Sequence, residues 1–236
     1  MGISCALVVI YVLLGAPAAL ICVPVTLLSG DASLMYVWGM GITRLGLRWV
    51  GIRPKLSGLE HIDRSRQYLF LSNHVSNLDP VMLLPEIPVK IAVFIKRPLM
   101  RIPILGYCMR LSSFIPVDRT GDIEGARASI RRAAEVLASG LSVVSFVEGT
   151  RSKDGHLLPF KKGPFYLAME TKVPIIPVSI HGTEKMMPKG RMSIRRRAAN
   201  IVFHAPIWPD QYPDRESLML AVRSSIAAGL PEWMRC

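Results

Sequence analysis

The first charged side chain in this sequence is Asp31, and residues 1–30 are mostly apolar. A helix that crosses the hydrocarbon core of a bilayer needs roughly 20 consecutive apolar residues, and the range 3–28 is long enough. A cleaved signal peptide is the main alternative. It would carry basic residues before its apolar run, and Met1 to Ala6 has none. The sequence therefore predicts an N-terminal membrane-embedded helical segment.

Gly15, Pro17 and Pro24 interrupt this apolar run. Prolines remove backbone donors and bend helices, and a second apolar stretch follows at residues 32–43. Two arrangements stay open. Two short helices could dip into one leaflet and return, or one straight helix could span the bilayer.

Basic residues follow the apolar part of the chain: Arg44, Arg48, Arg53 and Lys55. By the positive-inside rule, such residues place the following domain on the cytoplasmic face of the membrane. They can also contact anionic lipid headgroups, each contributing about 1 kcal/mol near the surface. From the formal net charge of +12 we also expect an anionic partner, but charge alone does not separate lipid, phosphorylated substrate and nucleic acid.

The four cysteines match neither a disulfide framework nor a zinc site, and they are Cys5, Cys22, Cys108 and Cys236. We expect them to be reduced, in a domain that faces a cytosol-like compartment. The sequence also contains no zinc-knuckle spacing, RNP-like aromatic strand or basic coiled coil, which are signatures of nucleic-acid binding.

After Gly51 the composition becomes that of an α/β domain. Apolar runs typical of strands occur at 67–72, 91–95, 114–117, 142–147, 175–180 and 200–204, and helical patterns at 123–139, 164–170 and 215–228. Strands that alternate with helices favour a mixed, mostly parallel sheet flanked by helices on both faces. We therefore expect a membrane-anchoring helical segment at 1–50 and an α/β domain at 51–236.

His74 and Asp79 stand just after the strand-like run 67–72. The carboxyl ends of strands are where α/β proteins place ligands, and a histidine there can act as a general base if a carboxylate orients it. Five residues apart, the pair would not share a face of a regular helix, so it requires a bend. On spacing alone, the simpler interpretation is that Asp79 caps a helix starting at Pro80.

Three further runs carry candidate binding residues. Residues 146–152 follow a strand, with a glycine that lets the backbone approach a ligand and Arg151, whose guanidinium suits phosphate. Arg119 ends the run 114–119 and could be a second phosphate ligand, or one half of a surface pair with Asp118. In the run 173–178, Pro177 suggests an edge strand or a bulge.

Together and in this order, the four runs resemble the glycerolipid acyltransferase family, in particular the 1-acyl-glycerol-3-phosphate acyltransferases. The first block, Asn-His-x-Ser-x-x-Asp, is matched by Asn73, His74, Ser76 and Asp79; the second by Gly106, Phe114, Ile115 and Arg119; the third, Phe-Pro-Glu-Gly-Thr-Arg-Ser, by 146–152; and the fourth, Val-Pro-Ile-Ile-Pro-Val, by 173–178. Val147 departs from the pattern, because it replaces the family's usual proline in the third block.

The resemblance implies a mechanism and a phosphate-binding site. His74 would deprotonate the free hydroxyl of a lysophospholipid, and Asp79 would orient His74. The predicted phosphate-binding residues are Arg119 and Arg151, with Glu148, Gly149 and Thr150 shaping the loop. The resemblance implies no metal, no cofactor and no acyl-enzyme; acyl-CoA or acyl carrier protein would be the donor, lysophosphatidic acid the acceptor and phosphatidic acid the product.

Three alternatives stay open. The acceptor could be another lyso-lipid, such as a lyso-amino-lipid or another lysophospholipid. The chain could be a lipid-binding protein without catalysis, although both His74 and Asp79 are present. The net charge keeps a nucleic-acid binder as the third alternative.

Overall fold

A computed structural model describes residues 2–117 and 123–235 of the chain. It begins with two long helices, α1 (Gly2–Ser29) and α2 (Ser33–Trp49). The strands that follow are β1 (Lys55–Ser57), β2 (Leu69–Ser72), β3 (Ile91–Lys96), β4 (Ile115–Val117), β5 (Ser142–Phe146), β6 (Ile175–His181) and β7 (Asn200–Phe203). The further α-helices are α3 (Leu78–Leu83), α4 (Leu105–Leu111), α5 (Ile123–Ala138), α6 (Gly163–Thr171), α7 (Thr183–Met186) and α8 (Arg215–Ala228). Short 3-10 turns include η2 (Leu84–Glu86) and η3 (Arg97–Arg101).

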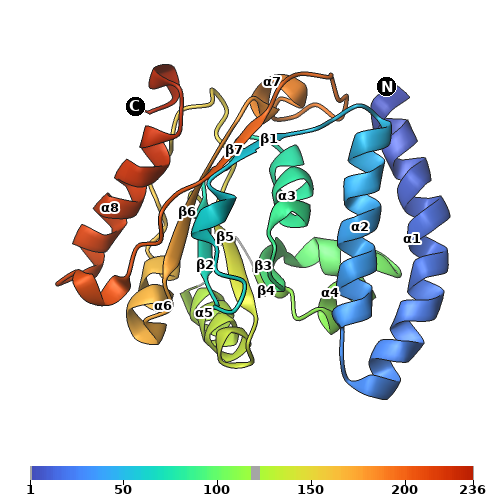
Figure 1. Cartoon of the computed structure of the whole chain (residues 1–236), viewed down its shortest axis with the longest axis horizontal. Coiled ribbons are helices and arrows are strands. Elements are labelled where there is room, and N and C mark those ends of the chain that lie inside the picture. Colours follow the sequence, from blue (N-terminus) through green and yellow to red (C-terminus); the bar gives the residue numbers. More distant parts are fainter. Residues whose placement is uncertain (1, 118–122, 236) are drawn as a thin grey trace.

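The N-terminal segment is a helical hairpin in which α1 and α2 pack side by side (Figure 1). The structure has the two returning helices of one predicted arrangement, but α1 is one long helix that continues through Pro17 and Pro24. By length and composition, α1 is able to cross a membrane. Its residues Leu7 and Ile10 pack into the core of the domain, whereas most of the helix is exposed.

The described strands form one sheet in the order β1-β7-β6-β2-β5-β3-β4. All neighbouring strands are parallel except β6 and β7. The predicted mixed, mostly parallel sheet is therefore confirmed. Every residue of β2 and most of β5 and β6 are buried, as expected for strands that helices cover on both faces.

Two apolar clusters cover the two faces of this sheet. One packs α1, α2 and α3 against the sheet, and its members include Leu47, Met82 and Phe70. The other packs α5, α6 and α8 against the opposite face. Figure 1 shows these two sets of helices on opposite sides of the strands. The carboxyl ends of β2, β5 and β6 consequently meet at one edge between the two layers.

Pro177 lies in an internal strand, so the edge prediction was wrong. It pairs with Leu71 of β2 in the centre of the sheet. On the other side of β6, Val178 opposes Phe203, but Ile175 opposes Ile207. The second strand therefore holds one extra residue, which is a bulge. The missing N–H of Pro177 falls where this bulge interrupts the ladder, and the predicted bulge is confirmed.

Candidate active site

Asn73 fixes the point at which the chain leaves β2. Its side-chain amide donates to the carbonyl of Ile180 across 2.8 Å, and its side-chain oxygen accepts from the Ile180 N–H across 2.8 Å. The amide thus replaces the next backbone rung between β2 and β6. The backbone is free to turn at this point while the sheet remains bonded, and the next residue, His74, lies at the carboxyl edge.

His74 and Asp79 form a hydrogen-bonded pair, with 2.8 Å between His74 Nδ1 and Asp79 Oδ2. A carboxylate at this distance accepts a hydrogen bond from Nδ1–H, so Nε2 carries the free lone pair. No described residue bonds to Nε2, and 11% of the histidine side chain is exposed. The imidazole also stacks on the ring of Phe146, with 4.3 Å between the ring centroids.

The bend between the two residues is built by Asp79 itself. Its Oδ2 also accepts from the backbone N–H groups of Val75 and Ser76, at 2.7 and 2.8 Å. The helix begins at Leu78, and the side chain of Asn77 before it makes no capping hydrogen bond. The predicted helix start at Pro80 with Asp79 as its cap was therefore wrong. The carboxylate instead closes the turn that carries His74.

Thr183 completes the surroundings of the carboxylate. Its hydroxyl donates to Asp79 Oδ1 across 2.5 Å, and both residues are fully buried. The fully buried Ser76 donates to the Met187 carbonyl across 2.8 Å. These two bonds tie the His74 turn to α7 and the residue after it. A buried carboxylate with donors on both oxygens is held in one orientation.

Glu148 bonds to the backbone of the same turn, whereas Asp79 bonds to the His74 side chain. Its Oε1 accepts from the backbone N–H of His74 across 2.6 Å, and its Oε2 accepts from the Leu158 N–H across 3.0 Å. Burial, and to a smaller extent the nearby charge of Asp79, raise the pKa of this carboxyl to about 7, although the two backbone N–H donors act to lower it. The side chain is 2% exposed, and its two oxygens join the His74 turn to the segment at Leu158.

The loop after β5 holds His74 by its carbonyl as well. The Ser152 N–H donates to the His74 oxygen across 2.9 Å. Gly149 makes the turn with φ +67°, a conformation that favours glycine. A Cβ at this position would lie 3.0 Å from the Lys161 side chain. The close approach and the positive φ both explain the glycine.

Both the backbone and the side chain of Val147 make contacts that account for a valine at this position. Its N–H donates to the Ser72 carbonyl across 3.0 Å, which extends the bonding between β2 and β5 by one residue. Its side chain is fully buried in the apolar cluster that packs α5, α6 and α8 against the sheet. The family's usual proline has no N–H and could not make this bond. The departure therefore changes the attachment of the loop to β2.

The remaining residues of the predicted phosphate site are Thr150, Arg151 and Arg119, and the structure describes the first two. Thr150 is exposed and Arg151 is half-buried on the loop that also carries Glu148. The Arg151 carbonyl accepts from the Lys189 ammonium across 2.6 Å, so a second cation lies beside this loop. Arg119 lies outside the described residues.

Three residues of this site received no role from the sequence. Asn73 was part of a recognised block, and its pairing with Ile180 becomes visible only in the sheet. Thr183 lies two residues after the end of β6, and this position at the carboxyl edge was an available signal. Arg223 of α8 donates to the carbonyls of Leu157 and Leu158, and no local pattern around it points to the site.

The family model described as Acyltransferase matches residues 53–181, more than half of the chain. The chain belongs to the acyltransferase family. The matched range contains His74, Asp79 and the loop 146–152. In this acyltransferase the first and third recognised blocks meet at one edge of the sheet, where the loop after β5 bonds to the backbone of His74.

Relatives of known name agree with this assignment. The chain is 36% identical to a chloroplastic 1-acyl-sn-glycerol-3-phosphate acyltransferase of Brassica napus, over 66% of this chain and 45% of the relative. It is 33% identical to one from Limnanthes douglasii, over 70% of this chain and 58% of the relative. For the human alpha enzyme the identity is 34%, over 68% and 56%. The matched part thus spans about half the length of these relatives.

A solved structure has the same fold over nearly its whole length. The crystal structure of the 1-acyl-sn-glycerophosphate (LPA) acyltransferase PlsC from Thermotoga maritima is 25% identical. The TM-score is 0.80, and the match covers 96% of this chain and 94% of that chain. The similarity therefore extends to the N-terminal helices, which lie outside the range that the family model matches.

Proposed function

We propose that this acyltransferase transfers a fatty acyl group from an acyl thioester to the free hydroxyl of 1-acyl-glycerol-3-phosphate, giving phosphatidic acid. The observation that carries the proposal is the pair of His74 and Asp79, 2.8 Å apart at the carboxyl edge of the sheet. The named activity of the relatives supports the choice of acceptor.

In the proposed reaction, His74 Nε2 takes the proton from the acceptor hydroxyl as the oxygen attacks the thioester carbonyl. Asp79 stabilises the imidazolium that forms, because its Oδ2 accepts from Nδ1–H. The tetrahedral intermediate collapses, the C–S bond breaks and the thiolate leaves, taking up the proton that His74 holds. This scheme uses acid–base chemistry of the chain's own residues and needs neither a metal nor a cofactor.

The acceptor's phosphate is proposed to bind at the loop after β5. Arg151 is the described residue with a guanidinium available there, and Arg119 is the second proposed ligand. Glu148, Gly149 and Thr150 set the shape of the loop rather than supplying positive charge. Such a site would hold the phosphate while the free hydroxyl reaches His74.

The apolar hairpin is proposed to anchor the enzyme, with residues 1–50 in the membrane and 51–236 on the cytoplasmic face. Exposed apolar side chains on α1 support the membrane contact: Val8, Val12, Leu13, Leu20 and Leu28. A lysophospholipid could then enter the site from the plane of the bilayer. The proposed donor is acyl-CoA or acyl carrier protein, which would dock from the aqueous side.

The test is an acceptor panel with the purified full chain. Lysophosphatidic acid, other lysophospholipids and a lyso-amino-lipid are supplied with an acyl thioester, and release of free thiol is measured. We expect turnover with lysophosphatidic acid, and its abolition in His74→Ala with membrane association retained. His61→Ala is the matched control, because His61 is exposed on a short turn away from the site. Turnover by His74→Ala, or a preference for a phosphate-free acceptor, would contradict the proposal.

A further inference from the structure

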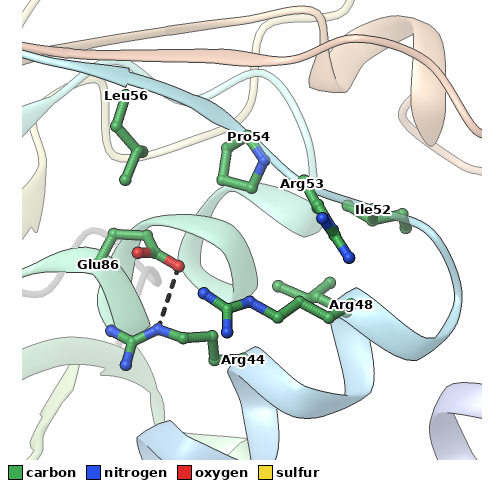
Figure 2. Close-up of a pocket in the computed structure, with 8 residues that line it drawn as sticks. Arg44, Arg48, Ile52, Arg53, Pro54, Leu56 and Glu86 are labelled. Atoms are coloured by element: carbon green, nitrogen blue, oxygen red, sulfur yellow. Dashed lines mark hydrogen bonds and ion pairs between the residues drawn. The ribbon is translucent and has the colours of Figure 1, made fainter.

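A cavity of about 420 Å³ opens between the C-terminal half of α2, the segment after it and Glu86 of η2. Three arginines line it, Arg44, Arg48 and Arg53. Figure 2 shows Arg53 directed toward Arg48, and Arg48 directed toward the pair of Arg44 and Glu86. The cavity shares no lining residue with the surroundings of His74 described above.

The three arginine side chains differ in whether they have a hydrogen-bond or ion-pair partner. Arg44 forms an ion pair with Glu86, 3.4 Å from Nε to Oε1, and its Nη2 donates to the Pro85 carbonyl. The side chains of Arg48 and Arg53 make no hydrogen bond or ion pair with any described residue. With Glu86 counted against Arg44, the cavity holds two uncompensated positive charges. Like charges gathered in one hollow favour an anion between them.

Arg48 is not needed to complete its own helix. A cation in the last turn of a helix can bond to its free carbonyls and stabilise it. Here that function falls to Arg196, whose Nε donates to the Val50 carbonyl across 2.8 Å. The guanidinium of Arg48 is thereby left to face the cavity rather than the end of α2.

The cavity combines this charge with an apolar wall. Leu47 and Ile52 line it and are each only 2% exposed, so they belong to the domain core. A pocket of a few hundred Å³ with apolar walls and a few placed polar groups is typical of a small-molecule site. Guanidinium forks match phosphate oxygens in geometry and charge.

The position of the cavity indicates which kind of molecule would carry a phosphate group into it. Trp49, next to Arg48, is 66% exposed, and α2 also exposes Trp38 and Leu45. Tryptophans are enriched at the headgroup level of membranes, and basic pockets beside membrane helices bind lipid headgroups. We propose that this cavity is a second phosphate site, which binds the headgroup of an anionic membrane phospholipid through Arg48 and Arg53.

The two free charges make a further distinction between lipids. A phosphate monoester carries about −1.5 to −2 charges near pH 7, which matches the two free guanidinium groups. A phosphodiester headgroup carries one negative charge. We therefore expect monoester lipids to bind more tightly than diester lipids, and zwitterionic lipids to bind weakest.

The test uses native mass spectrometry of the full chain in detergent, titrated with short-chain phosphatidic acid, phosphatidylglycerol, phosphatidylcholine or inorganic phosphate. The variant is Arg48→Gln with Arg53→Gln, since both side chains are exposed and unpaired. Arg44 is left intact because it holds α2 to η2. The matched control is Arg127→Gln with Arg131→Gln on α5, which removes the same charge from two exposed arginines elsewhere. Thermal unfolding checks that both variants are folded.

We expect the cavity variant to bind phosphatidic acid about 10-fold more weakly than wild type, because two charge-assisted hydrogen-bonding groups are lost. The control should change by less than about 2-fold, as surface charge alone contributes little. Phosphatidylglycerol should show the same dependence at lower affinity, which separates this cavity from a product site beside His74. Equal losses in both variants would overturn the proposal. Inorganic phosphate that competes as well as the lipids would overturn the lipid headgroup as the source.

Discussion

The backbone N–H of His74 donates to the carboxylate of Glu148 across 2.6 Å. The His74 carbonyl in turn accepts from Ser152, four residues beyond Glu148. Both polar groups of the histidine backbone are therefore held by one loop, while Asp79 holds its side chain. The recognised blocks at 73–79 and 146–152 are thus parts of one bonded unit.

Glu148 should make stability depend on pH in a defined window. Its pKa is raised by burial from 4.5 to about 7, so between these values the folded chain holds a proton that the unfolded chain has lost. Stability should therefore fall as pH rises from 4.5 to 7, by up to about 3 kcal/mol at 1.36 kcal/mol per pKa unit. Denaturant unfolding of wild type and Glu148→Gln across pH 4.5–8 measures the difference.

The glutamine variant cannot titrate, so its stability should vary less across that window. Histidines also titrate there, and for that reason the difference between the two proteins is the informative quantity. A constant difference from pH 4.5 to pH 8 would show that Glu148 is ionised throughout.

Thr183→Val should slow catalysis without weakening substrate binding. The substitution keeps the shape but removes the hydroxyl that donates to Asp79 Oδ1. Losing a hydrogen bond to a charged group costs about 1.5–3 kcal/mol, and we expect kcat to fall about 10-fold or more with KM little changed. Thr171→Val is the control, because its hydroxyl bonds only within α6, to the Leu167 carbonyl. A rise in KM with kcat unchanged would contradict a positioning role for Thr183.

The strands were predictable because they are buried on both faces. Continuous apolar runs at β2, β5 and β6 give the same pattern in any parallel sheet that helices cover. β1 was missed because it has only three residues, two of them exposed, and its extended form depends on pairing with β7. The helix α4 was missed as well, and it follows Ile104, whose φ of +61° no local propensity favours.

The site was predictable only where the residues in contact lie close together in the sequence. The bend between His74 and Asp79 follows from their spacing, and the structure has it. The start of α3 did not follow, because Asp before Pro is also a common cap signal. The contact of Asp79 with Thr183 joins residues 104 apart, and the Asn73–Ile180 pairing joins residues 107 apart. Such contacts depend on the strand order, which no local pattern contains.

Val147→Pro should destabilise this chain although proline is usual in the family. The Ser72 carbonyl would lose its 3.0 Å bond from the Val147 N–H, and an unsatisfied buried group costs about 1–3 kcal/mol. Val147→Ala is the control, since it loses more buried apolar surface than Val147→Pro but keeps the N–H. Thermal unfolding should rank alanine above proline. The reverse order would show that the loop gains more from proline's rigidity than from this bond.

Gly149→Ala should impair both stability and turnover. Alanine in the left-handed region costs about 1–2 kcal/mol, and its Cβ would lie 3.0 Å from Lys161. The control is Gly190→Ala, which has φ +89° and open space around its Cβ. Both variants should lose stability, but only Gly149→Ala should lose turnover, because its loop holds the His74 backbone. Equal turnover in the two variants would mean that the loop tolerates this shift.

Charges on the exposed face of α1 should release the protein from membranes. Val12→Lys with Leu13→Lys places two cations on side chains that are 60% and 66% exposed. A lysine in the hydrocarbon region costs about 2.5–3.5 kcal/mol, and we expect the fraction bound to neutral vesicles to fall about 10-fold or more. The control is Leu220→Lys with Ile123→Lys, at positions 64% and 70% exposed on α8 and α5. The control variant adds the same net charge, so any difference in co-sedimentation between the two variants is caused by where the charges lie. If the control dissociates as readily, membrane contact is made by the face that carries α5 and α8.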